Sequence, residues 1–221
     1  DIGCYTLGMV PPLRAADFLF CMGSSISAGS GFSMVSDRPV IGFIGDSTFF
    51  HSGMTGLANA VFNKHDMLLV ILDNGTTAMT GHQPNPGVAP TVLGQDCEHL
   101  DIESVVRGIG VTDVVKVKPF NLRGTLKALE DMKARSGVRV VISEEPCMLF
   151  ARRTLKQVRP QVAEVATQGE EALRCLTELA CPAFRRSGTA EAPIVSVDES
   201  QCSGCMVCLQ VTPAFRARKR S

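Results

Sequence analysis

The sequence predicts an α/β protein with a doubly wound, mostly parallel sheet, followed by a small α+β domain near the C-terminus. Two observations predict the sheet: short apolar runs alternate with helical patterns through residues 1–150, and polar segments directly follow two of those runs. A third observation predicts the small domain, because from about residue 175 the chain becomes rich in cysteine, proline and short segments. We therefore expect a first domain over residues 1–155, a linker over 156–174 and a small domain over 175–221.

Four apolar runs predict the strands of the sheet. They are VIGFI (40–44), LLVIL (68–72), VTDVVKV (111–117) and VRVVIS (138–143). Near-continuous apolar runs of this length are typical of parallel strands that are buried on both faces.

The segments between and after these strands predict the remaining elements. Apolar residues at helical spacing predict helices over residues 53–64 and 121–135. Residues 76–90 contain three prolines, three threonines and two glycines, and they predict a loop long enough to be functional. The polar residues 152–170 predict a helical linker, and PIVSVD (193–198) predicts a small strand.

The composition narrows the possible partners. Acidic and basic side chains number 22 each, so the net charge gives no reason to expect nucleic acid or a membrane surface as a partner. No apolar run approaches the ~18 residues of a spanning helix, and no signal-peptide pattern is present. Nine cysteines without a secretory signal favour metal binding in a reducing compartment, the cytoplasm, over disulfides.

The two ends of the chain lead to one expectation each. Because the chain begins with Asp1, we expect a piece of a longer polypeptide or a processed one. The C-terminal basic run predicts a frayed, solvated tail, and docking onto an acidic redox partner is the alternative. This run consists of Arg216, Arg218, Lys219 and Arg220.

Polar residues follow the first two predicted strands at the edge where a parallel sheet binds ligands. Asp46 offers a carboxylate oxygen, Asn74 an amide oxygen and Thr76 a backbone carbonyl, the hard ligands that Mg²⁺ prefers. Gly45 allows close approach of a phosphate, and a helix that starts near Ser52 offers free N–H groups to it. The alternative is that Asp and Asn simply begin loops here, as they often do after strands.

The spacing between the two polar segments matches a known motif. G-D, then about 26 residues, then D-N is typical of thiamine diphosphate sites. The segments DIGCYTLG (1–8), CMGSSISAGSG (21–31), GDSTFFHSG (45–53) and LDNGTTAMTGHQPNPG (72–87) resemble the 2-oxoacid:ferredoxin oxidoreductase family, in particular the large subunits of indolepyruvate:ferredoxin oxidoreductases. The resemblance covers nearly the whole chain. Ser47 and Asp73 depart from the general thiamine pattern, where many families have Gly and Asn, but both look normal for this family.

The resemblance implies a set of site residues. It implies Mg²⁺ on Asp46, Asn74 and Thr76, and His51 as a catalytic residue. The residues implied in cofactor binding are Gly45, Asp46, Ser47, Asn74, Thr76, Cys21, Met22, Gly23 and Gly81.

Several of these residues have an ordinary structural alternative. His51 and His82 either contact substrate or diphosphate, or are loop histidines that make a hydrogen bond. Packing is favoured over cofactor contact for Met22 and Met79. Cys4 lies in a segment that resembles the family's active-site edge, but an inert buried thiol fits it as well, and a structural role is the alternative for Cys21, Cys97 and Cys147.

The cysteines near the C-terminus predict a metal centre. Cys202, Cys205 and Cys208 follow the C-x2-C-x2-C spacing of iron–sulfur proteins, with Thr212 where the cysteine before Pro213 is expected. In two-cluster ferredoxins that cysteine ligates the other cluster, so the fourth ligand here is expected to be Cys181, which precedes a proline. A zinc site is the alternative for four cysteines, but its usual spacing pairs two C-x2-C motifs.

The resemblance also suggests where a second cluster is missing. Its ligands would lie at Gly169, Ala172, Cys175 and Thr212, and only one of these is a cysteine. We therefore expect one [4Fe–4S] cluster, with Cys175 as an ordinary thiol.

The implied reaction is oxidative decarboxylation of an aryl-2-oxoacid such as indolepyruvate to its acyl-CoA, with electrons passing through the cluster to ferredoxin. The chain has no second sheet to carry the Glu that activates the aminopyrimidine ring, and Glu144 and Glu145 are expected to be solvated or to face the linker. We therefore expect a partner chain or domain that carries this Glu, and a second oxidoreductase subunit. The alternatives are a non-oxidative thiamine-dependent 2-oxoacid decarboxylase, or an electron-transfer or assembly module without catalysis.

Overall fold

The computed structural model describes residues 1–220, which form two compact units. The first unit contains residues 1–7 and 18–150, and the second contains residues 8–17 and 151–220. Each unit has its own buried core.

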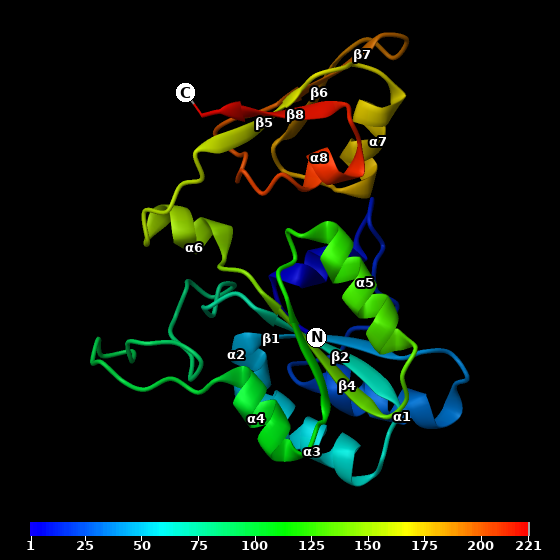
Figure 1. The fold of residues 1–221 in the computed structure, drawn as a ribbon, viewed down its shortest axis with the longest axis vertical. Helices are drawn as coiled ribbons and strands as arrows, with labels where there is room; N and C mark the ends of the chain where they lie inside the picture. The colour runs from blue at the N-terminus through cyan, green and yellow to red at the C-terminus, as the bar shows by residue number, and fades with distance from the viewer. Residues whose placement is uncertain (221) are drawn as a thin grey trace. The chain divides into compact units, whose positions relative to one another are not determined.

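The first unit is built on a four-stranded parallel sheet with the strand order β1-β2-β4-β3 (Figure 1). The strands are β1 (Ile41–Gly45), β2 (Met67–Asp73), β3 (Asp113–Val117) and β4 (Val138–Glu144). Each lies on one of the four predicted apolar runs, so the prediction of a mostly parallel α/β sheet is confirmed.

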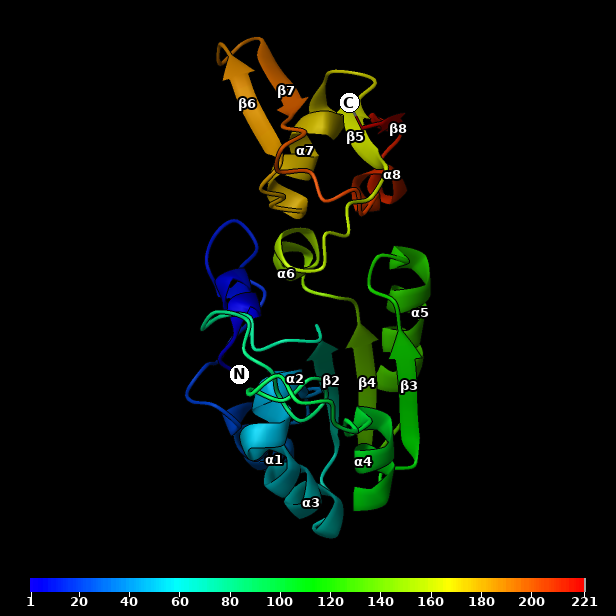
Figure 2. The same cartoon turned by 90° about the vertical axis from the view of Figure 1, so that its left-hand side faces the viewer.

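Helices cover both faces of this sheet, as Figure 2 shows. The helices α1 (Ser24–Val35), α3 (Met54–Phe62) and α4 (Ile102–Ile109) pack on the face that buries Leu69 and Ile71, and α5 (Leu122–Lys133) packs on the face that buries Leu68 and Val70. Successive residues of β2 thus point to opposite cores, which explains its unbroken apolar run. A 3₁₀ helix (η1, Cys4–Met9) precedes α1, and α6 (Met148–Arg153) follows β4.

The helix after β1 begins earlier than predicted. It starts at Asp46 with α2 (Asp46–Thr48), passes through a π-helical turn (η2, Phe49–Gly53) and continues as α3. The π turn contains an extra residue, which shifts the apolar pattern out of phase and buries Phe49 and Phe50 side by side. The expected helix start near Ser52 is therefore wrong, and the free N–H groups of the first turn lie directly after Gly45.

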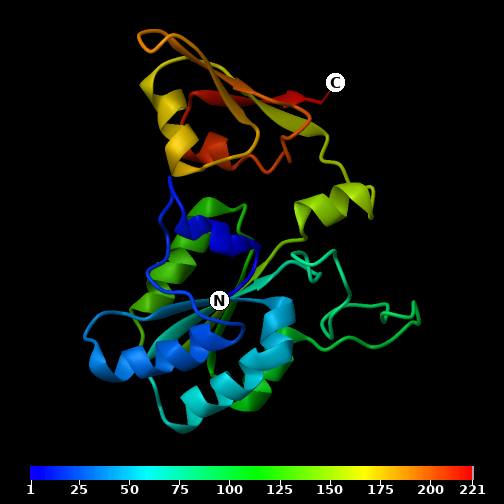
Figure 3. The same ribbon diagram turned by 180° about the vertical axis from the view of Figure 1, so that it is seen from behind.

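A long segment without helix or strand joins β2 to α4 over residues 74–101, and Figure 3 shows it leaving the end of β2. The predicted loop over residues 76–90 lies within it and is confirmed. A single β-bridge between Thr77 and Gln83 folds its first part back on itself.

The second unit has the element order β-α-β-β-α-β. Its elements are β5 (Gln161–Val165), α7 (Glu170–Glu178), β6 (Phe184–Gly188), β7 (Pro193–Val197), α8 (Val207–Val211) and β8 (Phe215–Lys219). Strands β5 and β8 pair antiparallel, and β6 and β7 form a second antiparallel pair. The core between them includes Val162, Cys175, Phe184 and Phe215.

Two expectations for this unit are wrong. The polar stretch 152–170 is not a helical linker, because it contains β5, in which Val162 and Ala163 are buried. The basic run 216–220 is not a frayed tail, because residues 216–219 lie in β8 and Arg216 lies opposite Glu164 of β5. The cross-strand ion pair of these two side chains explains why both strands look polar in sequence. The expected domain boundaries stay predictions.

No helix within residues 1–220 combines the length and apolar character needed to cross a bilayer.

Candidate functional site

The carboxyl ends of β1 and β2 bring the two predicted polar segments together. The parallel register places Gly45 beside Leu72, so Asp46 and Asp73 follow the strands at the same edge of the sheet. A hydrogen bond of 2.9 Å from Thr77 Oγ1 to Ser47 Oγ joins the two segments. This edge is where open α/β sheets bind their ligands.

Asp46 is the most unusual side chain at this edge. Asp46 is 2% exposed, and its carboxylate accepts hydrogen bonds from the backbone N–H of Ser47 at 2.7 Å and from Asn85 Nδ2 at 3.1 Å. Burial raises the pKa of Asp46 to about 6, although the Ser47 and Asn85 bonds oppose the shift. None of the ion pairs within residues 1–220 involves this carboxylate. It is a buried anion held by neutral donors.

Asn74 and Thr76 lie next to Asp46, as the predicted Mg²⁺ site requires. Asn74 Oδ1 accepts a hydrogen bond from the backbone N–H of Thr76 at 3.1 Å. The same N–H also donates to the Asp46 carboxylate, which lowers the pKa of Asp46. Thr76 is 2% exposed. Burial also raises the pKa of Asp73, which lies one residue before Asn74. The three predicted ligands therefore converge, and their role stays a prediction.

The turn before α1 brings Cys21, Met22 and Gly23 to the helix that follows Asp46. Gly23 has a positive φ of 86°, and a Cβ there would lie 2.6 Å from Ser52 Oγ. The Ser52 hydroxyl is buried and has no hydrogen-bond partner within residues 1–220. Cys21 is exposed, its backbone is bonded to Ser24, and Met22 is 43% exposed. Gly23 thus leaves room beside an unused hydroxyl group.

The predicted histidines and Gly81 lie around the same edge. His51 is exposed on the π-helical turn. His82 has a positive φ of 65°, its ring stacks on Phe150 with centroids 5.3 Å apart, and its Nδ1 is buried without a hydrogen-bond partner among residues 1–220. Gly81 precedes it with a φ of 117°, which only glycine adopts easily. The catalytic role of His51 and the contacts of Gly81 stay predictions.

Three residues of the site were not predicted from the sequence. Asn85 holds Asp46, Thr77 bonds to Ser47, and the Tyr5 hydroxyl accepts the backbone N–H of Gly45 at 3.1 Å. Burial raises the pKa of Tyr5 to about 12, so it stays a neutral phenol. Only the presence of Asn85 and Thr77 in a long loop pointed to them, and no periodic pattern marks Tyr5.

Two cavities lie at opposite edges of this sheet. One of about 250 Å³ lies at the carboxyl edge and is lined by residues that include Asp73, Gly75, Gly87, His99 and Glu144. The predicted solvation of Glu144 holds in part, because its partly exposed carboxylate pairs with Lys118.

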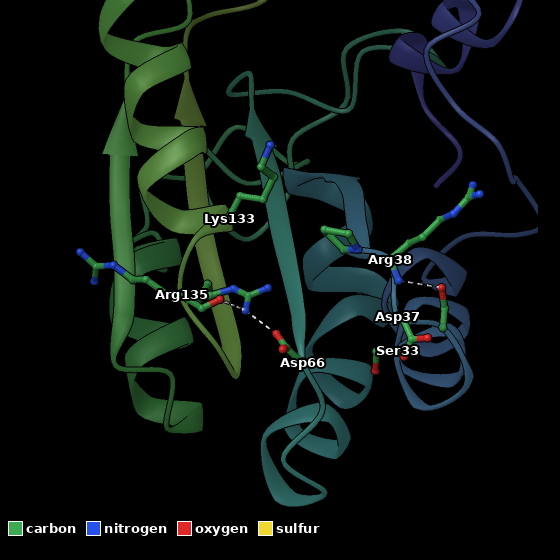
Figure 4. A pocket seen from close by; sticks show the side chains of 9 residues that line it. Ser33, Asp37, Arg38, Asp66, Lys133 and Arg135 are labelled. Atoms are coloured by element: carbon green, nitrogen blue, oxygen red, sulfur yellow. Dashed lines mark hydrogen bonds and ion pairs between the residues drawn. The ribbon is translucent and has the colours of Figure 1, made fainter.

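The other cavity, of about 260 Å³, lies at the amino ends of the strands (Figure 4). There the guanidinium of Arg139, 3% exposed, bonds to Asp66 and to the carbonyl of Arg135. No predicted site residue lines this cavity.

The four cysteines predicted to hold a cluster share one region of the second unit. Cys202 and Cys208 are buried, and Cys181 and Cys205 are half-buried. Burial raises the pKa of Cys208 to about 12, and the thiols of Cys205, Cys181 and Cys202 add to this shift. Within residues 1–220, no three His, Cys, Asp or Glu side chains converge closely enough to hold one metal ion. These two findings are compatible, because thiolates that bind different corners of a cube lie farther apart than the ligands of a single ion.

The expected position of a second cluster is filled by protein side chains. Ala172 and Cys175 are fully buried in the core, and Thr212 is 3% exposed. The Thr212 hydroxyl donates to the carboxylate of Glu171 and accepts the backbone N–H of Ala214. Burial raises the pKa of Cys175, which keeps it a protonated thiol.

Comparison with known proteins adds to this geometry. Residues 1–143 match the family model for "Thiamine pyrophosphate enzyme, C-terminal TPP binding domain". Indolepyruvate oxidoreductase subunit IorA of Methanothermobacter thermautotrophicus is 45% identical over 218 residues, which cover 97% of this chain and 34% of that protein. IorA of Archaeoglobus fulgidus is 41% identical over 214 residues, covering 96% of this chain and 34% of that protein. The chain thus spans about a third of the length of these curated relatives.

Among solved structures, the 2-oxoglutarate:ferredoxin oxidoreductase from Magnetococcus marinus is similar with a TM-score of 0.52 and 18% identity. The match covers 57% of this chain and 46% of that chain. At this level of identity the likeness concerns the fold.

Proposed function

This chain belongs to the thiamine pyrophosphate enzyme family, whose C-terminal TPP-binding domain it contains, and on that premise we propose that it is part of a 2-oxoacid:ferredoxin oxidoreductase. The proposed cofactors are thiamine diphosphate with Mg²⁺ at the carboxyl ends of β1 and β2, and one [4Fe–4S] cluster in the second unit. The proposed substrates are an aryl-2-oxoacid such as indolepyruvate, and CoA. The identity to IorA proteins supports the choice of family and reaction.

The observation that carries the thiamine site is the buried carboxylate of Asp46. A buried anion without a counter-charge is unfavourable, and a divalent cation removes that penalty. The unpartnered hydroxyl of Ser52 and the space that Gly23 leaves beside it also fit a group with phosphate oxygens. The residues present therefore fit Mg²⁺ and a diphosphate.

The chain's own residues have distinct tasks in this proposal. Asp46, Asn74 and Thr76 hold the cation through oxygen atoms, and Asn85 keeps the Asp46 carboxylate in place. Apart from the Ser47 N–H, which donates to Asp46, the free N–H groups in the first turn of the helix that begins at Asp46 would bind the phosphate end. When bound, thiamine diphosphate supplies the electron sink that decarboxylation of a 2-oxoacid requires.

The second unit supports the cluster by its topology and its cysteines. The order β-α-β-β-α-β is the order of ferredoxin-like folds, and Cys181, Cys202, Cys205 and Cys208 share one region. A cluster accepts electrons singly, as transfer to a ferredoxin requires. A chain with both sites fits oxidative decarboxylation better than simple decarboxylation.

The site is incomplete without other protein parts. The first unit has one sheet, and thiamine enzymes take the Glu that activates the aminopyrimidine ring from another domain. We propose that a domain or chain outside these residues supplies it and that a second subunit and ferredoxin complete the system.

Calorimetric titration with thiamine diphosphate, with and without Mg²⁺, tests the site. We expect weak binding that requires Mg²⁺ and is lost in Asp46→Ala, while Asp131→Ala, an exposed change on α5, binds as the original chain does. Tight binding by a folded Asp46→Ala chain contradicts the assignment. The chain alone should reduce no ferredoxin with indolepyruvate and CoA, and turnover by it would show that the activating Glu lies within these residues.

A further inference from the structure

The loop that leads into Cys202 is fixed at its start by its own hydrogen bonds. Asp198 Oδ1 accepts the backbone N–H and the hydroxyl of Ser200 at 3.0 and 2.6 Å, and the Asp198 carbonyl accepts the N–H of Cys202 at 2.9 Å. The loop thus turns tightly just before the first of the three closely spaced cysteines. The carbonyl groups of Glu199, Ser200 and Cys202 in this loop accept their hydrogen bonds from arginine side chains.

Arg220 supplies most of these donors. Its guanidinium donates to the carbonyls of Cys202 at 2.7 Å, Glu199 at 2.9 Å and Arg159 at 3.2 Å. Its backbone N–H donates to the Pro160 carbonyl at 2.8 Å, which fixes the end of β8 beside the start of β5. One side chain therefore connects the Cys202 loop to both strands of the β5–β8 pair.

Two other arginines hold the same loop. Arg152 Nη1 donates to the Ser200 carbonyl at 2.8 Å, and Arg218 Nη2 bonds to Glu199 Oε2 at 2.6 Å. Arg218 also pairs with Glu164, so its charge is shared between two carboxylates. Arg220 differs, because its guanidinium contacts only carbonyl oxygens and makes no ion pair with a carboxylate of residues 1–220. Within the described residues, its guanidinium therefore has no carboxylate partner.

The loop also contacts β5 without intervening side chains. Gly204 is buried with a φ of 73°, and a Cβ at this position would lie 2.5 Å from the Gln161 carbonyl. Cys202, two residues earlier, is 8% exposed. The guanidinium of Arg220 thus contacts the backbone carbonyl of a buried cysteine, where charges interact more strongly than in water.

Resting on the [4Fe–4S] cluster proposed above, we propose that Arg220 is a positioning residue that fixes Cys202 and stabilises the reduced form of the cluster. A cluster with four thiolates is an anion, and each added electron increases its negative charge. A fixed cation at the backbone of one ligand therefore favours reduction, and hydrogen bonds and local charge are known to set cluster potentials. Arg220 thereby raises the reduction potential of the cluster.

The test compares Arg220→Ala and Arg220→Lys with Arg216→Ala in the anaerobically purified full chain. Arg216 is the matched control, because it lies on β8, the strand that ends just before Arg220, has a side chain 69% exposed and pairs with Glu164. Three quantities are measured: the cluster midpoint potential, the rate of iron loss to a chelator, and amide hydrogen exchange at residues 199–204. Circular dichroism confirms that each variant is folded.

We expect Arg220→Ala to move the potential to more negative values and to release iron faster. Exchange at residues 199–204 should accelerate roughly tenfold or more, because the side-chain bonds that hold the loop are lost. Arg220→Lys should keep most of the original midpoint potential, because it keeps the positive charge. It should not keep the slow amide exchange, because an ammonium group cannot reproduce the hydrogen bonds of the guanidinium to three carbonyls. Arg216→Ala should change none of the three.

Two results overturn the inference. One is an Arg220→Ala chain with the original potential and exchange. The other is an equal shift of potential in Arg216→Ala, which reduces the effect to general surface charge. If the original chain takes up no iron, the cluster proposal fails instead, and exchange in the iron-free chain then decides whether Arg220 holds the loop.

Discussion

Replacing Asp46 with Asn separates two effects of the buried carboxylate: its unfavourable contribution to the free energy of unfolding and its contribution to cofactor binding. Burial raises the Asp46 pKa to about 6 from its ordinary value of 3.8. The raised pKa means that the folded chain binds the proton more tightly than the unfolded chain does. The resulting stability is present below pH 3.8 and is lost as the pH rises through about 6, so at pH 7 the ionised group destabilises the fold.

The magnitude follows from this difference in pKa. It corresponds to about 3 kcal/mol at pH 7 if the whole shift is relieved. An Asn side chain is neutral but accepts hydrogen bonds only through Oδ1. Asn at position 46 therefore keeps the bond from the Ser47 N–H but loses the bond from Asn85, because two NH₂ groups then face each other. Allowing for this loss, Asp46→Asn should raise the free energy of unfolding without cofactor by about 1–2 kcal/mol.

Urea unfolding at pH 7 and pH 5, with and without Mg²⁺ and thiamine diphosphate, measures both effects. Without cofactor, the variant should be the more stable chain at pH 7, and its advantage should shrink at pH 5 as Asp46 of the original chain takes up a proton. With cofactor, only the original chain should gain stability. A variant that is less stable without cofactor would refute the buried-charge argument, and one that gains equally from the cofactor would refute the ligand assignment.

Three further predictions concern other parts of the chain. Gly23→Ala should lower the free energy of unfolding by about 1–3 kcal/mol, because Gly23 has a positive φ and its Cβ would press on Ser52; Gly31→Ala, in the open on α1, should raise it by about 0.5–1 kcal/mol, and equal thermal melts would contradict this. Cys181→Ala should lose iron as completely as Cys205→Ala, while Cys175→Ala keeps about four iron atoms per chain; the reverse pattern in iron analysis would show the ligand set to be wrong. Asp66→Asn should lower stability by about 1–3 kcal/mol in urea, since it leaves the buried Arg139 without its carboxylate; Asp113→Asn, whose partner Arg135 is exposed, should change it by less than about 1 kcal/mol, and similar losses would refute the distinction.

The sheet was predictable because its signal is local. Residues such as Leu69 and Val70 are buried on opposite faces of one strand, so the apolar run is continuous and marks the strand without any knowledge of its neighbours. The convergence of Asp46 with Asn74 followed from the rule that parallel strands end at one edge. Asn85 could not be predicted in the same way, because its contact with Asp46 spans 39 positions and Asn85 itself lies in a segment without helix or strand.

The second unit was harder to predict, because its strands are half polar. In β5 only Val162 and Ala163 are buried among five residues, and Glu164 is explained only by Arg216 opposite. The same holds for Arg220, whose role depends on carbonyls of residues 159, 199 and 202 that meet only in the folded chain. Cysteine spacing, by contrast, is a chemical constraint that stays visible along the chain.

The side chains at the expected position of the second cluster also affect how the small unit folds. Ala172 and Cys175 are packed in the core of the second unit, and Thr212 is hydrogen-bonded to Glu171. The Cys202–Cys208 segment shares this core through its two buried cysteines, but it has only one short helix, α8, and its loop is held by turns and carbonyl bonds. In the proposed holoprotein, the cluster therefore adds cross-links to a core that protein contacts already form. Chains made under iron limitation should then keep the core of the second unit and lose only the constraint on the cysteine segment.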